Sequence, residues 1–543
     1  MPKFNVPIPA RVPDTRTAEG GEGFTRSTKD ELFLLAVANM VGVDTHYETG
    51  KSRDDRFERL IHEVTKADEK WMTGFIGWLR TEANMRSAPI IAAAEYVRAG
   101  GSGGRQVVTS VLQRPDEPGE MLGYWLGRYG RKIPQPVKRG VADALGRLYT
   151  ERNVLRCDGQ GNAIRFGDVV ELVHPKPLNS DQGALFRHAI DRRHNRDGGP
   201  PSVLATLVED ARLMHLPESE RRAHLADAIA CGWSWERLGG WLPGGMDAEA
   251  WEAVIPNMGL MALTRNLRNF DKVGVSDRAA LAVTQRFMDP DEVARSRQFP
   301  LRFLTAWKAT TSVRWGMALE GALNASLASV PSLPGRTLIL VDVSPSMSDT
   351  ALSRRTDGRA DPAITPQRWE VAGVFGAAIA QRAEKADVVC FDFNPLASAQ
   401  IHGRESILRF VEQCGQLANN SGGTDILRAL AESYQGHDRV VILTDEQAGY
   451  QPGHQPYQMG GWPYGQTLTG ERYGWQDVAN IHCPVHTFNL GGYATGVTPN
   501  ERNWHTIGGL TDACFRLIPL VEARHRGAWP WEVSSDPQAP RAD

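Results

Sequence analysis

A short apolar run that ends in a row of oxygen-bearing side chains constrains the fold of this chain more than any other feature. Leu338–Val341 is continuously apolar, and Asp342, Ser344 and Ser346 follow it. A continuous apolar stretch of this length is typical of a strand that is buried on both faces of a parallel sheet. Ligands of α/β proteins bind at the carboxyl ends of such strands. The sequence therefore predicts a parallel sheet with one carboxylate and two hydroxyl groups at its ligand-binding edge.

Two later segments supply further oxygen donors in a similar context. Thr424 follows two glycines at the start of a helical pattern, and Asp445 follows the apolar run Val440–Leu443 with one threonine between them. Mg²⁺ and Mn²⁺ prefer hard oxygen ligands, and Mg²⁺ keeps several waters in a near-octahedral shell. If Ser344 and Ser346 merely capped the next helix, the ordered threonine and aspartate would stay unexplained. We therefore predict a divalent-cation site with one open position and with the ligands Asp342, Ser344, Ser346, Thr424 and Asp445.

These residues resemble the metal-ion-dependent adhesion site (MIDAS) of a von Willebrand factor A (vWA) domain. The resemblance implies a doubly wound, Rossmann-like α/β domain whose Mg²⁺ or Mn²⁺ bridges to a carboxylate or phosphate of a protein partner. Alternating apolar runs and helical patterns after residue 335 agree with a parallel sheet covered by helices. The expected strands lie near 336–342, 387–393, 439–445, 484–490 and 513–518, and the expected helices near 366–385, 404–416, 424–435 and 518–525.

The part of the chain before residue 330 has helical periodicity and no strand alternation. Trp71, Phe75, Trp78 and Leu79 are spaced as on one buried helix face, and a second stripe begins at Val137. Pro and Gly separate several such patterns, which favours antiparallel helix pairs of the α-solenoid kind, although no regular repeat period stands out. The predicted organisation is an N-terminal arm over 1–28, a helical domain over 29–330, the vWA domain over 336–532 and a disordered tail over 533–543.

The overall charge is close to balanced, with 61 basic and 64 acidic residues. Nine basic residues lie between 128 and 165 against three acidic ones, which permits phosphate contacts, although such a run is more often a solvated face. The six cysteines are scattered without a Cys-x-x-Cys motif, as in a reducing cytoplasm. The N-terminus has no signal-peptide core and no apolar run reaches transmembrane length, so we predict a cytoplasmic protein without a membrane partner.

An all-α region followed by a vWA domain resembles the TROVE-domain proteins, the family of the Ro ribonucleoprotein autoantigen and its bacterial homologues. The individual segments that resemble this family are Lys138–Asp143, Leu172–Pro177, Trp251–Leu267 and Arg297–Lys308. The resemblance implies a closed ring of HEAT-like helical repeats. It also implies that small noncoding Y-type RNA binds the outer surface and that single-stranded ends of misfolded RNAs enter the central hole. This is a role in RNA quality control, with an exoribonuclease as a further partner.

Basic residues of the helical domain are the candidates for RNA contacts. Binding by charge predicts an affinity that falls steeply with salt. The stretch 157–166 lacks most of the basic side chains that the family carries there, so we expect different contacts with Y-type RNA. A lone histidine beside a helix end is more often structural than RNA-contacting. The candidates are Lys132, Lys138, Arg139, His174, Arg187, Arg265 and Arg268.

Three functions could account for these motifs. We favour a non-enzymatic RNA-binding scaffold, since the sequence holds no paired carboxylates, Cys–His arrangement or Walker-type loop in a convincing context. The alternative is a cytoplasmic vWA assembly factor that acts beside an AAA+ ATPase without a role in RNA. That alternative explains the metal motif but not the basic stretch or the Ro-like segments. A metallohydrolase is disfavoured, because a vWA-type site lacks the general base and positioned water that hydrolysis requires.

Two long loops, over 349–366 and 447–475, leave the predicted sheet near the metal residues. The second is rich in glycine and in aromatic residues, so we predict that it gates the metal site and contacts a partner or RNA bases. The same composition is equally consistent with a low-complexity insertion that has no binding role. The aromatic residues of this loop are Tyr450, Tyr457, Trp462, Tyr464, Tyr473 and Trp475.

Overall fold

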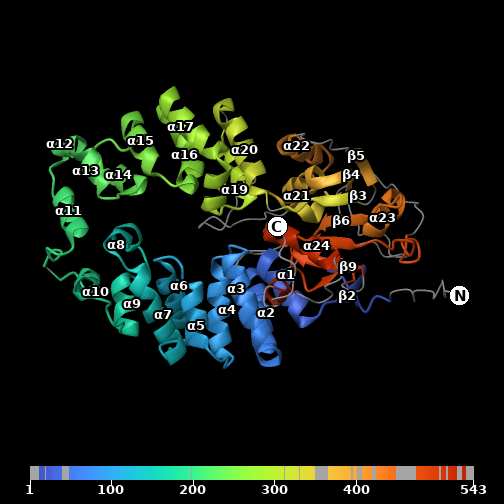
Figure 1. The fold of residues 1–543 in the computed structure, drawn as a ribbon, viewed down its shortest axis with the longest axis horizontal. Helices are drawn as coiled ribbons and strands as arrows, with labels where there is room; N and C mark the ends of the chain where they lie inside the picture. The colour runs from blue at the N-terminus through green and yellow to red at the C-terminus, as the bar shows by residue number, and fades with distance from the viewer. Residues whose placement is uncertain are drawn as a thin grey trace, which may run out of the picture. The chain divides into compact units, whose positions relative to one another are not determined.

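The computed structural model has two compact units (Figure 1). The first unit comprises the described residues within Met1–Leu60, Phe299–Lys308 and Leu323–Trp529. The second comprises those within Ile61–Gln298, Ala309–Ala322 and Pro530–Asp543. The residues that the structure describes are 12–18, 20–38, 48–196, 198–310, 312–328, 330–348, 365–392, 395–399, 406–418, 424–447, 473–499, 503–508, 512–522 and 529–533.

The second unit is built from helices joined by short turns. None of the described helices combines the length and the apolar character that a membrane span requires. Helix α2 (Gly50–Ala67) begins in the first unit, and α19 (Pro300–Ala309) lies almost entirely there. The other helices up to the sheet are α3 (Glu69–Thr81), α4 (Ser87–Arg98), α5 (Gly104–Val111), α6 (Glu117–Tyr129), α7 (Gln135–Leu148), α8 (Glu151–Cys157), α9 (Phe166–Val173), α10 (Ser180–Arg193), α11 (Ala205–Met214), α12 (Glu218–Arg221), α13 (Leu225–Ala230), α14 (Trp235–Trp241), α15 (Ala248–Val254), α16 (Leu260–Val273), α17 (Asp277–Met288), α18 (Pro290–Ser296) and α20 (Gly316–Ser326).

The apolar spacing of these helices buries one face of each. On α3, Trp71, Phe75, Trp78 and Leu79 are at most 6% exposed, which confirms the predicted stripe. The stripe that begins at Val137 on α7 is buried as well. Helices α3 and α4 pack against α5, α5 packs against α7, and α9 packs against α7 and α10. The predicted all-α region before the sheet is confirmed, while its closure into a ring stays a prediction.

The first unit contains a six-stranded sheet with the strand order β5-β4-β3-β6-β7-β9. Strand β5 runs antiparallel to β4, and every other neighbouring pair is parallel. This is the predicted doubly wound α/β arrangement. The strands are β3 (Leu333–Asp342), β4 (Ala383–Phe391), β5 (Pro395–Ala399), β6 (Arg439–Thr444), β7 (Val485–Asn489) and β9 (Trp504–Gly508), and the helices are α21 (Arg368–Arg382), α22 (Ile407–Leu417), α23 (Ile426–Ser433) and α24 (Leu517–Glu522).

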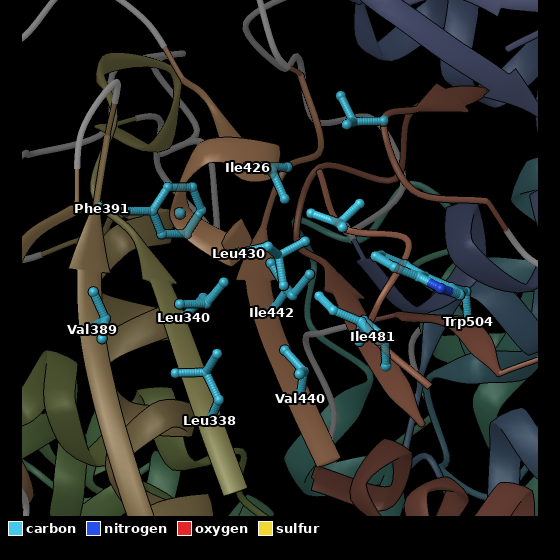
Figure 2. Packing of buried hydrophobic residues seen from close by; sticks show 14 residues of the cluster. Leu338, Leu340, Val389, Phe391, Ile426, Leu430, Val440, Ile442, Ile481 and Trp504 are labelled. Carbon is cyan, nitrogen blue, oxygen red and sulfur yellow. The ribbon is translucent and has the colours of Figure 1, made fainter. Parts of the chain in front are cut away.

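Both faces of this sheet are covered, which explains the continuous apolar runs of its central strands. Leu340 of β3 lies in one buried cluster with Leu430 of α23 (Figure 2). The next residue, Val341, faces α21 on the other side, where a Cβ on Gly376 would lie 2.9 Å from Val341 Cγ2. Successive side chains of a strand alternate between faces, so helices on both faces require apolar residues at every position.

The predicted parallel strand over 513–518 is wrong. These residues form the 3-10 helix η5 (Asp512–Arg516) and the start of α24. The Phe515 ring packs on Phe375 of α21 and on Phe488 of β7, with ring centroids 4.9 and 5.2 Å apart. The last parallel strand is β9 instead, in which two half-buried polar residues separate the buried Trp504 and Ile507. An edge strand with this mixed composition carries no continuous apolar signal.

The described part of the N-terminal arm forms strands that join the first unit. Strand β1 (Thr15–Arg16) pairs with β2 (Glu22–Thr25), and β2 pairs antiparallel with β8 (Thr495–Gly496). Helix α1 (Thr28–Ala38) then packs against β9. Residues predicted for an arm and for the start of the helical domain therefore contribute to the unit that holds the sheet.

The last described element is α25 (Pro530–Val533), in the second unit. Trp531 packs against Trp71 and Phe75 of α3, with ring centroids 5.1 and 5.2 Å apart. Gly74 leaves room for this ring, since a Cβ there would lie 2.4 Å from a Trp531 ring atom. Of the predicted tail, residues 534–543 lie outside the described residues.

Candidate metal centre and basic surface

The carboxyl ends of β3 and β6 meet at a topological switch point. The chain passes from β3 to β4 on one side, and β6 later pairs with β3 on the other side. In open α/β sheets, ligands bind at such a point, outside the carboxyl ends of the strands. Asp342 is the last residue of β3, and Asp445 follows the last residue of β6. The topology thus brings these two carboxylates to one edge of the sheet.

The turn after β3 places two hydroxyl groups beside each other. The Ser344 N–H donates to Asp342 Oδ1 at 2.9 Å, and the Oγ atoms of Ser344 and Ser346 lie 3.3 Å apart. From the neighbouring strand, the Thr444 hydroxyl donates to Asp342 Oδ2 at 2.5 Å. All four residues are at most 5% exposed. Three of the five predicted ligands therefore share one buried turn.

Thr424 approaches this edge of the sheet on the loop before α23. The Asp425 N–H donates to the carbonyl oxygen of Asp392, directly after β4, at 3.0 Å. Thr424 itself is 3% exposed. Asp425 has a different role, because its carboxylate accepts from the Arg428 N–H at 2.9 Å and so caps α23. The loop is thus anchored at the carboxyl end of the strand next to β3.

Two buried carboxylates lie at one edge of the sheet, where a bound cation would offset their mutual repulsion. Asp342 and Asp445 are both 0% exposed. Burial, together with repulsion from Asp445, raises the pKa of Asp342 to about 7. Two carboxylates with three hydroxyls form the hard oxygen donor set that suits Mg²⁺ or Mn²⁺. No group of three or more His, Cys, Asp or Glu side chains suited to a metal occurs among the described residues, so a cation here depends on the hydroxyls.

Sequence reasoning missed the residues that hold the Asp445 turn. Glu446 is fully buried and has a φ of 59°, in the left-handed region. Its carboxylate pairs with Arg26, directly after β2, and accepts from Asn489 Nδ2 at 2.7 Å. Asn489 carried a signal, as a polar residue at the carboxyl end of a predicted strand. Arg26 carried none, because 420 positions separate it from Glu446.

Most of the two predicted functional loops lies outside the described residues, namely 349–364 and 448–472. Two of the six aromatic residues are described. Trp475 packs edge-on against Phe24 of β2 and Trp504 of β9, each with ring centroids 5.3 Å apart. The Tyr473 hydroxyl donates to Glu432 at 3.0 Å. Trp475 therefore belongs to the packing of the first unit, so the aromatic count of the loop overstated its exposed surface.

The candidate RNA-binding residues come from three parts of the second unit: the region of α7, the end of α9 together with α10, and α16. All are exposed except Lys138, which is half-exposed. None of them forms an ion pair with a described residue. His174 ends α9 with a left-handed φ of 47°. The seven residues are Lys132, Lys138, Arg139, His174, Arg187, Arg265 and Arg268.

Helix α16 carries the most regular part of this surface. Arg265 and Arg268 lie on its exposed face, and Lys272 extends the stripe by one turn. Sequence reasoning missed Lys272, although its spacing of four residues from Arg268 was a signal, since residues four apart share a helix face. The opposite face of α16 is buried through residues such as Leu263 and Phe270.

The basic stretch 128–165 is not one solvated patch. Arg165 is 6% exposed and donates to the buried Asp158 carboxylate at 3.1 Å. Arg147 donates to the carbonyl oxygens of Thr109 and Leu112. A buried carboxylate needs a paired cation, so Arg165 serves the fold, and the count of basic residues overstated the charge available to a ligand.

A family model described as the TROVE domain matches residues 234–315, the stretch that contains α16. Over this stretch the chain is thus similar to TROVE-domain proteins. The RNA-binding protein RO60 of Deinococcus radiodurans is 24% identical to this chain over 484 residues, which cover 82% of this chain and 86% of that protein. The telomerase protein component 1 of Mus musculus is 44% identical over 64 residues, 11% of this chain and 2% of that protein.

The fold of this chain is also found in a solved structure. The crystal structure of the Deinococcus radiodurans RO (RSR) protein matches with a TM-score of 0.60 and 16% sequence identity. The match covers 90% of this chain and 97% of that chain. At this identity the likeness concerns the fold, an all-helical region followed by a doubly wound α/β unit.

Proposed function

We propose that this protein is a non-enzymatic RNA-binding scaffold of the Ro type. It binds small noncoding Y-type RNA and the single-stranded ends of misfolded RNAs in RNA quality control, in the cytoplasm and with an exoribonuclease as a partner. The observation that carries the proposal is the stripe Arg265, Arg268 and Lys272 on α16, within the matched TROVE region. The name of the related RO60 protein, which is an RNA-binding protein, supports it.

The α16 stripe has the chemistry of a phosphate-binding surface. Its three cations point away from the buried face of the helix and form no ion pair with a described residue. Some other exposed arginines are already neutralised by an ion pair. Arg105, for example, donates from Nε and Nη2 to both oxygens of Asp143 at 2.6 and 2.8 Å. Unpaired cations attract phosphates more strongly than paired ones, so the two kinds of arginine provide matched test positions.

The test compares RNA affinity at several salt concentrations. Replacing Arg265, Arg268 and Lys272 together with Gln should weaken binding of a fluorescent single-stranded RNA. It should also reduce the log–log salt slope by about 0.7 for each lost contact, about 2 in total. Arg105→Gln should change neither quantity. Unchanged affinity and slope in the triple variant would rule out α16 as the RNA surface, and a hairpin RNA assayed in parallel separates structured from single-stranded ligands.

The carboxyl edge of the sheet supports a second proposed activity of the same protein. We propose that Asp342, Ser344, Ser346, Thr424 and Asp445 hold Mg²⁺ or Mn²⁺. The bound cation would supply a Lewis-acidic position that bridges to a carboxylate or phosphate of a protein partner. The two fully buried carboxylates and the raised pKa of Asp342 support this proposal.

An assembly factor that acts beside an AAA+ ATPase would use the metal edge alone. The absorbance ratio of the purified protein, before and after nuclease treatment, distinguishes this alternative. Copurified nucleic acid that nuclease removes supports the RNA scaffold. A purified protein that carries no nucleic acid, and that does not bind the fluorescent RNA in the assay above, favours the assembly factor.

A further inference from the structure

The turn that carries Asp445 is held partly by residues from outside the α/β sequence region. Glu446 bonds Arg26 and Asn489, and it accepts from the Thr498 N–H at 3.2 Å. The Gln447 side-chain oxygen accepts from the Ala18 N–H at 2.8 Å. Both Glu446 and Gln447 are 0% exposed. Residues from the N-terminal hairpin thus form part of the wall behind the metal edge.

The loop after β7 lies directly against Asp445. A Cβ on Gly491 would lie 3.1 Å from the Cβ of Asp445 and 2.4 Å from a ring atom of Tyr493, so the loop passes in tight contact with the Asp445 side chain. The N–H groups of Gly491 and Gly492 donate to Asn489 Oδ1 at 2.9 and 2.6 Å. A shift of this loop would therefore change the space that the Asp445 side chain occupies.

Two arginines of α2 fix the other side of the same loop. Arg53 Nη1 donates to the carbonyl oxygen of Gly491 at 3.2 Å, and Arg56 Nη2 donates to that of Gly492 at 3.2 Å. Glu48 holds both guanidinium groups, at 3.0 Å from Arg53 and 2.7 Å from Arg56. The backbone of Gly491 and Gly492, beside Asp445, is thus held by Asn489 on one side. On the other side it is held by a clamp of Arg53 and Arg56, both paired with Glu48.

The charged groups of Arg53 and Arg56 in this clamp are buried, and burial of a charge is unfavourable. The side chains of Arg53 and Arg56 are 4% and 11% exposed. Burial, together with the nearby charges of Arg56 and Arg368, lowers the pKa of Arg53 to about 10. Ion pairs are weak evidence for stability when their desolvation offsets their attraction, and their best-supported use is to fix a specific arrangement. The arrangement fixed here is the loop behind Asp445.

We infer that Arg53 and Arg56 are positioning residues of the metal centre, acting through the Gly491–Gly492 backbone on Asp445. The inference rests on the metal site proposed above. Groups that orient metal ligands from the outer shell typically change metal affinity by about 10- to 100-fold when they are replaced. Helix α2 is then part of the metal centre, although 389 positions separate Arg56 from Asp445.

The experiment measures Mn²⁺ binding to the full-length protein by calorimetry, with thermal unfolding of the cation-free protein as a second readout. The variants are Arg53→Met and Arg56→Gln, with Arg53→Lys as the conservative rescue. The matched control is Arg336→Met, because Arg336 Nε bonds Asp387 at 2.6 Å at the amino end of β3, away from the metal edge. Asp342→Asn reports whether the bound cation occupies the proposed site.

We expect Arg53→Met and Arg56→Gln to weaken Mn²⁺ binding by about tenfold or more, Arg53→Lys by less, and Arg336→Met by no more than about twofold. If Arg53→Met does not fold, Arg56→Gln and Arg53→Lys decide the question. Affinities within about twofold of wild type in all clamp variants overturn the inference and leave the metal site standing. A wild-type protein that binds no cation, or one that binds equally after Asp342→Asn, overturns the metal site and the inference with it.

Discussion

The amino edge of the sheet holds a half-buried carboxylate and the carboxyl edge holds two buried ones, and the two edges neutralise these charges differently. At the amino edge, Arg439 Nε and Nη2 donate to the two oxygens of Glu522 at 2.6 and 2.7 Å. Although burial raises the pKa of Glu522, hydrogen bonds from Arg439 and His486 outweigh it and lower the pKa to about 2. At the carboxyl edge, burial and the charge of Asp445 raise the pKa of Asp342 to about 7.

The difference shows how one sheet can separate structural from ligand-binding charge. The amino edge contains its own cation, so its buried carboxylate is stable when ionised. Among the described residues, Asp342 accepts hydrogen bonds from Ser344 and Thr444 and forms no ion pair. A cation from solution would therefore favour its ionised form. The predictions that follow test whether this contrast between the edges is real.

Replacing Arg439 with Met should give the largest effect. Breaking a buried pair by removing one partner typically lowers the free energy of unfolding by about 3–5 kcal/mol. Because the Glu522 side chain is 20% exposed, we expect a loss at the lower end of that range, about 3 kcal/mol. The midpoint of urea unfolding measures this loss. Adding Glu522→Gln should recover part of the loss. A single variant within about 1 kcal/mol of wild type would show that this pair behaves like a surface ion pair.

Adding a divalent cation should stabilise the protein through the carboxyl edge. At a free Mg²⁺ or Mn²⁺ concentration one hundred times the dissociation constant, a single site contributes about 2.7 kcal/mol. Asp342→Asn should lose this gain, whereas Arg439→Met should keep it, since Arg439 lies at the other edge. Thermal unfolding with and without cation measures both. A gain that survives Asp342→Asn would place the cation elsewhere.

Acid should weaken the amino edge through Glu522. A carboxyl group whose pKa is lower in the folded protein stabilises the fold above its ordinary value of 4.5, and this stability is lost as the pH falls from 4.5 toward about 2. Partial exposure reduces the expected contribution to about 2 kcal/mol. Unfolding midpoints of wild type and Glu522→Gln, compared between pH 6 and pH 3, measure it. Parallel profiles for the two proteins would contradict the assignment.

The carboxyl edge was largely predictable from sequence because its determinants are local. Leu338–Val341 lies under helices on both faces, so its apolar run marks a central strand, and Asp342 follows at the strand end by chain order alone. The register then aligns Val341 with Leu443, which brings Thr444 opposite Asp342. Strand periodicity and topology together were enough to gather the candidate ligands.

The surroundings of this edge could not be predicted, because they depend on contacts between distant segments and on unusual backbone. The Arg26–Glu446 pair spans 420 positions, and the positive φ of Glu446 has no sequence signature comparable to glycine. Arg165 was counted as surface charge because nothing local shows that Asp158 is buried beneath it. Hydrophobic periodicity predicts which face of a helix or strand is buried, but it does not predict which residue a buried polar side chain contacts.

The smallest expected effects come from two substitutions that each remove one hydroxyl group, one at each edge of the sheet. They give the sharpest comparison of the two edges. Ser346→Ala deletes a proposed ligand, whereas Thr337→Val deletes a hydroxyl that accepts from Arg439 Nη1 at 3.2 Å. Without cation, each change should alter the free energy of unfolding by only about 1 kcal/mol, the usual size for one hydrogen bond. Calorimetry should then find about tenfold weaker Mn²⁺ binding, about 1.4 kcal/mol, for Ser346→Ala alone. Equal affinities in the two variants would mean that the Ser346 hydroxyl is no ligand and that the edges differ only in their carboxylates.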